Sequence, residues 1–142
     1  MTKKNLAIET ALIHVGNSPD KETGSVIPPI FQTSTYVQPS PGKHKGYEYT
    51  RSHNPTRTRL EEVLATSEKA KYSLVTSSGM AAITLVMHAL QKGSTIICGD
   101  DVYGGTYRLF TTVFQDHHNF IFVDTTDPSM IENELKKSKT AL

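Results

Sequence analysis

The sequence has one cysteine, no tryptophan and almost no net charge. A lone Cys98 cannot form an internal disulfide, which excludes a disulfide-stabilised secreted domain and makes a reducing compartment the default. No apolar run approaches the roughly 18 residues that a membrane-spanning helix needs, and the N-terminus leads into no secretory hydrophobic region. The 15 Lys and Arg residues nearly balance the 14 Asp and Glu residues, which argues against a nucleic-acid partner. We therefore expect a cytoplasmic protein with no membrane association.

The first part of the chain is rich in proline and lacks periodicity. Six of the seven prolines lie at or before Pro55, and residues 1–50 show no sustained helical or strand period. An irregular stretch of this length is unusual as an internal loop. Four aromatic residues in it argue against simple disorder, which remains the alternative. We interpret residues 1–54 as an arm that packs on something else, such as another subunit.

Residues 55–142 alternate between strand and helix patterns. We expect strands at residues 72–75, 95–98 and 120–123, and helices over residues 55–70, from residue 79 to a closing Gly93, around residues 107–114, and from residue 128. Asn54 and Asp127 are N-caps that each precede a proline. This alternation predicts βαβ units with a parallel sheet, so the fold class is α/β. Residues 140–142 resemble the start of another strand, which indicates the first part of a larger α/β protein.

The first candidate site is the turn at residues 77–80, between an expected strand and the following helix. Its hydroxyls, its glycine and the free N–H groups of a helix start suit an anion, most often a phosphate. Neither a Walker loop nor a G-x-G-x-x-G motif occurs in the chain. An ordinary Ser-Gly helix start explains this segment equally well when it is taken alone.

The second candidate site is residues 100–106, which follow the next strand. Two adjacent glycines predict a sharp backbone turn beneath Tyr103, whose ring could stack on a planar ligand and whose hydroxyl could carry a proton. By itself, a turn tyrosine that anchors a loop is the more common arrangement. We expect Asp100 and Asp101 to cap the next helix rather than to bind a metal.

The third candidate site is residues 47–57. Tyr49 and Arg51 are two residues apart, so in an extended chain their side chains point the same way. Both can donate hydrogen bonds to a phosphate dianion. The alternative interpretation is a solvated basic turn.

The other nucleophilic and metal-binding residue types form no constellation. None of the six histidines has a partner at metal-ligand spacing, and His117 and His118 are expected to be a surface pair at a helix end. Cys98 ends an apolar strand and is expected to pack in the core rather than act as a nucleophile. We therefore expect no metal site.

Together, the three segments resemble the Cys/Met-metabolism family of pyridoxal-phosphate (PLP) enzymes, which includes cystathionine γ-lyase, β-lyase and γ-synthase and methionine γ-lyase. The shared motifs are Y-x-Y-x-R-x-x-N-P-T at residues 47–56, S-S-G-M-A-A at residues 77–82 and D-x-Y-G-G-T at residues 101–106. Residues 28–36 also resemble the family's arm. The resemblance implies the fold-type I (aspartate-aminotransferase-like) architecture, of which the chain would form the N-terminal arm, residues 1–54, and the first βαβ units of the PLP-binding domain, residues 55–142.

The resemblance implies two sets of groups that bind the cofactor phosphate. Tyr49 and Arg51 match a pair that reaches across a dimer interface to the PLP of the neighbouring subunit. Ser78, Gly79 and Met80 match the turn whose backbone donors bind the phosphate of the chain's own PLP. The long arm is then explained by contact between subunits.

The resemblance also implies roles near the reacting atoms. Tyr103 matches a tyrosine that stacks on the pyridine ring and is a proposed acid–base group. Arg108 matches an arginine assigned to substrate contact in some members. The family uses PLP for elimination or replacement at Cβ or Cγ of small sulfur amino acids, and it forms homo-oligomers, as a dimer of dimers at full length.

The family's Schiff-base lysine lies in an S-A-T-K segment that would follow residue 142. Lys136, Lys137 and Lys139 stand in no such motif, so we expect the 142-residue chain to be an N-terminal portion that does not turn over substrate alone. Within the family, the motifs are most similar to bacterial cystathionine γ-lyase and β-lyase, with γ-synthase or methionine γ-lyase as alternatives. Outside it, a small phosphate-binding α/β module and a non-catalytic truncated product are the competing hypotheses.

Overall fold

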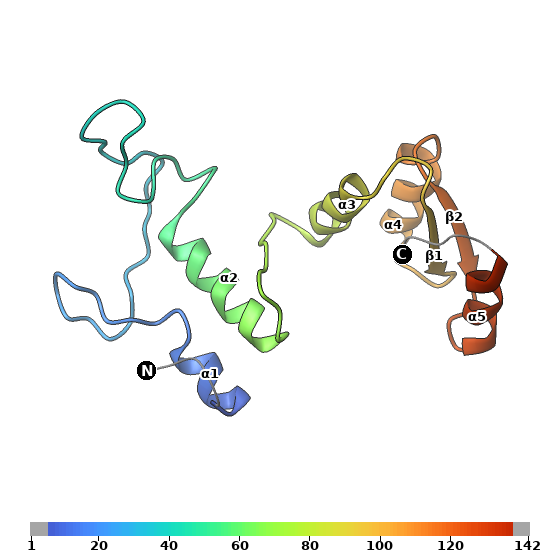
Figure 1. Cartoon of the computed structure of the whole chain (residues 1–142), viewed down its shortest axis with the longest axis horizontal. Coiled ribbons are helices and arrows are strands. Elements are labelled where there is room, and N and C mark those ends of the chain that lie inside the picture. The colour runs from blue at the N-terminus through green and yellow to red at the C-terminus, as the bar shows by residue number, and fades with distance from the viewer. Residues whose placement is uncertain (1–5, 138–142) are drawn as a thin grey trace. The chain divides into compact units, whose positions relative to one another are not determined.

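The computed structural model describes residues 6–137, which divide into two compact units between Val75 and Thr76 (Figure 1). The first unit contains helices α1 (Ile8–His14) and α2 (Pro55–Ser67), which are joined by the irregular part of the arm, residues 15–54. The second contains, in order, α3 (Gly79–Ala89), β1 (Thr95–Gly99), α4 (Gly104–Arg108), the π-helical segment η1 (Leu109–Val113), β2 (Asn119–Val123) and α5 (Pro128–Lys137). Within the described residues, no helix is long and apolar enough to cross a membrane.

Two short helices form the packed part of the first unit. Helix α1 lies against α2, and the small residues Ala11, Val15 and Ala65 are buried between them. Gly16 follows α1 with a φ of +73°, and a Cβ there would lie 3.0 Å from the backbone oxygen of Arg59. Both the left-handed backbone and this close approach favour glycine.

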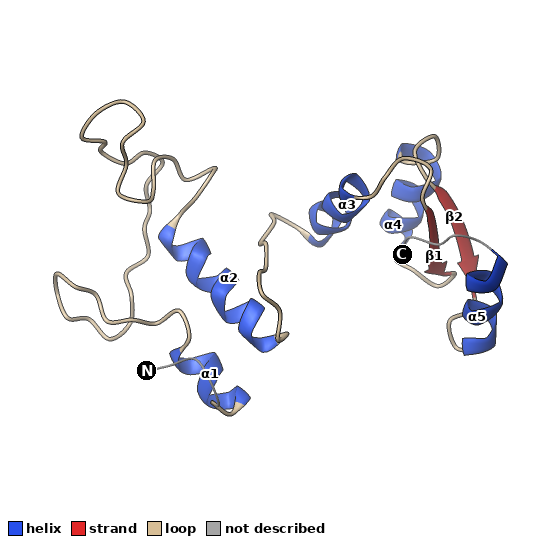
Figure 2. Ribbon diagram, viewed as in Figure 1, coloured by secondary structure: helices blue, strands red, loops and turns tan. Residues whose placement is uncertain are grey.

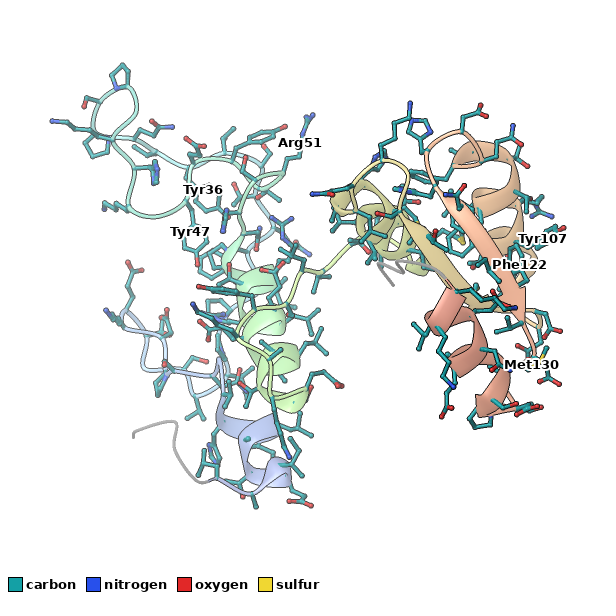
Figure 3. The ribbon with its side chains drawn as sticks, turned by 45° about the vertical axis from the view of Figure 1, so that its right-hand side comes forward. Tyr36, Tyr47, Arg51, Tyr107, Phe122 and Met130 are labelled. Carbon is teal, nitrogen blue, oxygen red and sulfur yellow. The ribbon has the colours of Figure 1, made fainter. Side chains whose placement is uncertain are left out.

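Two distant stretches of the arm pair by backbone hydrogen bonds. The Tyr36 N–H donates to the Glu48 carbonyl (3.2 Å) and the Thr50 N–H donates to the Ser34 carbonyl (2.8 Å). The rings of Tyr36 and Tyr47 lie next to one another with their centroids 5.7 Å apart (Figure 3). The arm is therefore a loop held together by its own backbone hydrogen bonds and by a contact between two aromatic rings.

The second unit is built on two parallel strands (Figure 2). Strand β1 pairs with β2 from Thr95↔Asn119 to Gly99↔Val123, and α4 and η1 form the connection between them. The core consists of Met87, Ile96, Phe110 and Phe114, with six half-buried apolar residues packed around it. The rings of Phe110 and Phe120 stack 4.5 Å apart. This is the α/β arrangement that the sequence pattern predicts.

The strand expected at residues 72–75 is wrong. This segment pairs with no strand among the described residues, and the side chains of Tyr72 and Leu74 are 75% and 74% exposed. Its backbone is held by a helix instead, because the Val75 N–H donates to a carboxylate oxygen of Glu61 (3.1 Å). A strand needs a partner backbone for its N–H and C=O groups, and a short apolar run does not supply one.

Several helix boundaries also differ from the sequence-based expectation. Helix α2 ends at Ser67 and Lys69 has a φ of +53°. Helix α3 ends at Ala89, so Gly93, with a φ of +85°, does not close it but shapes the turn into β1, where its N–H donates to the His117 carbonyl (2.7 Å). Helix α1 lies in a region where no helix was expected. Lys139 and the strand start expected at residues 140–142 lie outside the described residues.

Candidate cofactor site

The first unit brings together the side chains of Tyr49 and Arg51. The Nη2 atom of Arg51 donates to the Tyr49 hydroxyl (3.2 Å), and its guanidinium carbon lies 5.3 Å from the centre of the Tyr49 ring. Both residues are exposed, so their remaining donors are accessible to a ligand. Figure 3 shows Arg51 at the edge of the arm. The two side chains meet, but through a turn closed on the Tyr49 carbonyl by the Ser52 and His53 N–H groups (3.0 and 2.9 Å), and not through the extended chain expected from their spacing.

The backbone that carries this pair is fastened to α2. The Nη2 atom of Arg57 donates to the Ser52 carbonyl (2.6 Å) and reaches the Arg51 carbonyl (3.4 Å). Arg57 is oriented in turn by Glu61, one helical turn later, at 3.8 Å. The guanidinium of Arg57 is thus engaged in holding the turn, whereas that of Arg51 remains exposed.

The start of α3 presents free donors in the second unit. Ser78 is the N-cap, and its Oγ accepts from the Ala81 N–H (3.1 Å). Among the described residues, nothing accepts from the N–H groups of Gly79 and Met80. The first N–H groups of a helix lack partners within the helix and carry partial positive charge, so this pair suits an anionic oxygen.

Tyr103 is the N-cap of α4 and is 72% exposed. Its ring lies over Gly105, where a Cβ would be only 2.4 Å from Tyr103 Cε1. Neither Gly104 nor Gly105 has a positive φ, so the sharp turn expected from these glycines is wrong: they are the first residues of α4. Gly105 is needed instead for the space beneath the tyrosine ring, which the motif alone does not reveal.

The capping role expected for Asp100 and Asp101 is also wrong. Tyr103 occupies the N-cap position, and no side chain caps α4. A side-chain cap must lie directly before the helix to reach its N–H groups, and two residues separate Asp101 from Gly104. The capping expected of Asp127 is confirmed, because its Oδ1 accepts from the Ser129 N–H (2.9 Å).

The second unit joins α3 and α4 close to these candidate residues. The Thr106 hydroxyl lies 3.9 Å from the Met80 sulfur, and Thr106 is buried. The donor pair at the start of α3 and the α4 turn that carries Tyr103 therefore belong to one packed structure. Arg108 is exposed at the end of α4, and its guanidinium has no hydrogen-bond or ion-pair partner among the described residues.

Comparisons with known proteins show the family to which the chain belongs. A sequence profile of the Cys/Met metabolism PLP-dependent enzymes matches residues 9–142. The chain belongs to this family. It is 52% identical over 128 residues to a probable cystathionine γ-synthase of Herpetosiphon aurantiacus, with 89% of the chain and 40% of that protein covered. It is 45% identical over 140 residues to cystathionine β-lyase of Coxiella burnetii, with 97% and 35% covered.

Solved structures of the Cys/Met metabolism family have the same fold. A crystal structure of cystathionine γ-lyase from Lactobacillus plantarum, complexed with L-serine, matches with a TM-score of 0.79 and 40% identity. The match covers 90% of this chain and 34% of that structure. The chain thus has the fold of the matching part of fold-type I PLP enzymes and spans between 34% and 40% of the length of the relatives named here.

The residues present fit the family's cofactor, pyridoxal 5'-phosphate. A phosphate dianion needs positively polarised donors, and each unit offers its own: the exposed guanidinium of Arg51 in the first unit, and the two free N–H groups of Gly79 and Met80 in the second. A flat pyridine ring needs an exposed aromatic face, which Tyr103 provides. Among the described residues, no cluster of His, Cys, Asp or Glu could hold a metal ion.

Cys98 is half-buried beside the core of this family domain, as expected. Burial, with a smaller contribution from the negative charge of Asp101, raises the pKa of the Cys98 thiol above the ordinary 9.0. The folded chain therefore holds the thiol proton more tightly than the unfolded chain does. The stabilisation that this difference gives is present below the ordinary thiol pKa of 9.0, and it is lost as the pH rises through the raised pKa of the folded protein. The thiolate is the reactive form, so the thiol is expected to be inert near neutral pH.

Alkylation by iodoacetamide tests this prediction. At pH 7.5, Cys98 should react at least about tenfold more slowly in the folded protein than in the urea-unfolded chain, because the thiolate is scarce and shielded. The pH midpoint of the reaction should also lie higher in the folded protein. Equal rates and midpoints in the two states, measured by intact mass, would contradict the prediction.

The surface pair expected of His117 and His118 is wrong for one member. His118 is 6% exposed, stacks on Phe114 with 5.8 Å between ring centroids, and its Nε2 lies 3.0 Å from the Met87 carbonyl. His117 is exposed. No pattern in the sequence distinguishes the two, because the burial of His118 follows from the tight turn that precedes β2.

Proposed function

We propose that this protein performs PLP-dependent carbon–sulfur bond cleavage on a small sulfur amino acid of the cystathionine type. The profile match over residues 9–142 carries the proposal, since it spans all three candidate segments. The named relatives act on cystathionine or form it, by the names that they bear. A lyase is the activity we favour.

The proposal assigns two phosphate-binding groups to this chain. Tyr49 and Arg51 donate to the cofactor phosphate of a neighbouring subunit in a homo-oligomer, which gives the exposed pair a ligand. Ser78 caps α3 and, with the N–H groups of Gly79 and Met80, binds the phosphate of the chain's own cofactor. The free donors at both places support this assignment.

The remaining residues act near the substrate. Bound PLP supplies an electron sink that allows a proton to leave Cα and a bond to sulfur to break. Tyr103 stacks on the pyridine ring, and its hydroxyl oxygen holds or returns a proton as the leaving sulfur departs. Arg108 binds a carboxylate of the substrate through its exposed guanidinium.

Residues 1–142 supply only part of this site. The lysine, aspartate and arginine that complete it in the family stand in motifs that are not present in these residues. We therefore expect the polypeptide of residues 1–142, tested by itself, to show no steady turnover. Sustained release of a 2-oxo acid by that purified polypeptide would contradict this part of the proposal.

The products formed from cystathionine test the proposed activity. The native protein, supplied with PLP and cystathionine, should release ammonia and a 2-oxo acid. Cleavage at Cγ leaves cysteine and a four-carbon acid, whereas cleavage at Cβ leaves homocysteine and a three-carbon acid, so chromatography distinguishes the two lyases. Failure to consume cystathionine, or any other sulfur amino acid, would contradict a lyase.

A second activity, γ-replacement, is favoured by one observation. The 52% identical relative is a probable cystathionine γ-synthase. In that case the native protein would form cystathionine from cysteine and an amino acid with a leaving group on Cγ. The same chromatographic assay, run with these two substrates, separates synthesis from cleavage.

A further inference from the structure

Asn54 is a buried polar residue whose amide is fully engaged. It is 7% exposed. Its Oδ1 accepts from the Thr56 N–H (2.8 Å), which caps α2, while its Nδ2 donates to the Phe31 carbonyl (3.1 Å) and to the Thr50 hydroxyl (3.1 Å). An amide NH₂ has two hydrogens and both are used. The side chain therefore joins three parts of the first unit.

Thr50 is the residue between Tyr49 and Arg51, and it is fixed from three sides. Its N–H donates to the Ser34 carbonyl (2.8 Å), its hydroxyl donates to the Thr33 carbonyl, and the same hydroxyl accepts from Asn54. The chain turns directly after Tyr49, because the Ser52 and His53 N–H groups donate to the Tyr49 carbonyl (3.0 and 2.9 Å). With Thr50 fixed on its inner side, this turn brings the guanidinium of Arg51 over the exposed ring of Tyr49.

We propose that Asn54 is the positioning residue of the Tyr49–Arg51 pair. Its Nδ2 holds Thr50 and the Phe31 carbonyl together, and its Oδ1 binds the N-terminus of α2. These contacts fix the backbone on either side of Thr50 and so determine where Tyr49 and Arg51 place their donors. This inference rests on the proposed function, in which that pair binds the cofactor phosphate. Asn54 itself touches neither cofactor nor substrate.

The chemistry of the three hydrogen bonds explains why asparagine is needed. Aspartate keeps the acceptor for the Thr56 N–H and is an equally good helix cap, but it has no donor for the Phe31 carbonyl or the Thr50 hydroxyl. Serine keeps an acceptor on a shorter side chain and adds no charge, but its single O–H cannot replace the two N–H donors of the amide. Asn54 therefore has two roles that substitution can separate. Its Oδ1 caps α2, and its Nδ2 forms a clamp, by which we mean its two donations to the Phe31 carbonyl and the Thr50 hydroxyl.

Hydrogen exchange on the native protein tests the clamp directly. In Asn54→Asp, amides of the peptides that contain Tyr36 and Thr50 should exchange about tenfold faster, since each lost hydrogen bond contributes on the order of 1 kcal/mol. Peptides of α2 should change less than about threefold because the cap is kept. Asn17→Asp is the matched control: its Nδ2 also donates to a carbonyl, that of Ile13 (2.7 Å), but at the exposed end of α1.

Cofactor affinity tests the consequence for the pair. Asn54→Asp and the neutral Asn54→Ser should each weaken PLP binding about tenfold and leave the affinity for pyridoxal, which has no phosphate, within about twofold. General loss of structure would lower both affinities alike, so the ratio separates positioning from stability. Asn54→Ser serves where the buried carboxylate of the aspartate variant disturbs folding.

The outcomes distinguish this inference from the proposed function. If Arg51→Ala weakens PLP binding but neither Asn54 variant changes the PLP-to-pyridoxal ratio, Asn54 does not position the pair. Unchanged exchange at Tyr36 and Thr50 would overturn the clamp itself. If Arg51→Ala leaves PLP binding unchanged while exchange at those amides accelerates, Asn54 holds the arm and it is the phosphate role of the pair that fails.

Discussion

Replacement of Gly105 by alanine is expected to weaken PLP binding by about tenfold without lowering the free energy of unfolding. The added Cβ would lie 2.4 Å from Tyr103 Cε1, so the ring must swing away. The ring is the exposed part of a side chain that can rotate, so the backbone need not move. Alanine in a helix is also favoured over glycine by roughly 0.5–1 kcal/mol. Affinity and stability are therefore expected to change independently.

Gly104→Ala is the matched control for this prediction. The same substitution one residue earlier meets no atom within 4 Å, so Tyr103 keeps its place and PLP affinity should stay within about twofold. Tyr103→Ala should reproduce the loss seen in Gly105→Ala, and the double variant should lose no more than either alone, because both remove one contact. PLP titration followed by absorbance, with urea unfolding, measures both quantities. Equal PLP affinities of Gly104→Ala and Gly105→Ala would refute the role given to Gly105.

Arg51→Ala is expected to weaken PLP binding by roughly ten- to a hundredfold, since a hydrogen bond to a charged group contributes about 1.5–3 kcal/mol. Binding of pyridoxal should be unchanged, because it offers no phosphate. The exposure of Arg51 means that its removal leaves no buried group unpaired and costs the fold little. The effect should therefore appear in affinity and not in the unfolding midpoint.

Two further variants locate the effect of Arg51. Tyr49→Phe removes the hydroxyl 3.2 Å from Arg51 but keeps the ring beneath the guanidinium, so it should give a smaller loss of PLP affinity. Lys45→Ala removes an exposed positive charge from the same arm and should change affinity less than about twofold, since exposed charges are screened by salt. Equal losses for Lys45 and Arg51 would show that only the net charge of the arm matters.

The sequence predicts the periodic parts of the fold well. Apolar spacing locates α3 and the two strands, and the cap–proline pairs locate the starts of α2 and α5, because these features depend on residues that are neighbours along the chain. Local rules are sufficient for these elements. The contact between Tyr49 and Arg51 is a different case, because a turn closed on the Tyr49 carbonyl brings the two side chains together where an extended chain was expected.

Features that depend on distant partners escape such rules. Residues 72–75 have the composition of a strand but lack a paired backbone, and Glu61 binds Val75 instead. The space that Gly105 leaves for Tyr103 and the burial of His118 are tertiary facts. Asn54 reads as a helix cap from the sequence, which is correct, but its two donations bridge 23 and 4 residues and cannot be read from the capping pattern.

The central claim is that this chain binds a cofactor through its phosphate. The most direct test is the affinity of the native protein for PLP and for pyridoxal, measured by titration under the same conditions. The account predicts that PLP binds at least about a hundredfold more tightly, because the charge-assisted donors at Arg51 and at the start of α3 act only on the phosphate. Equal affinities for the two compounds would contradict it.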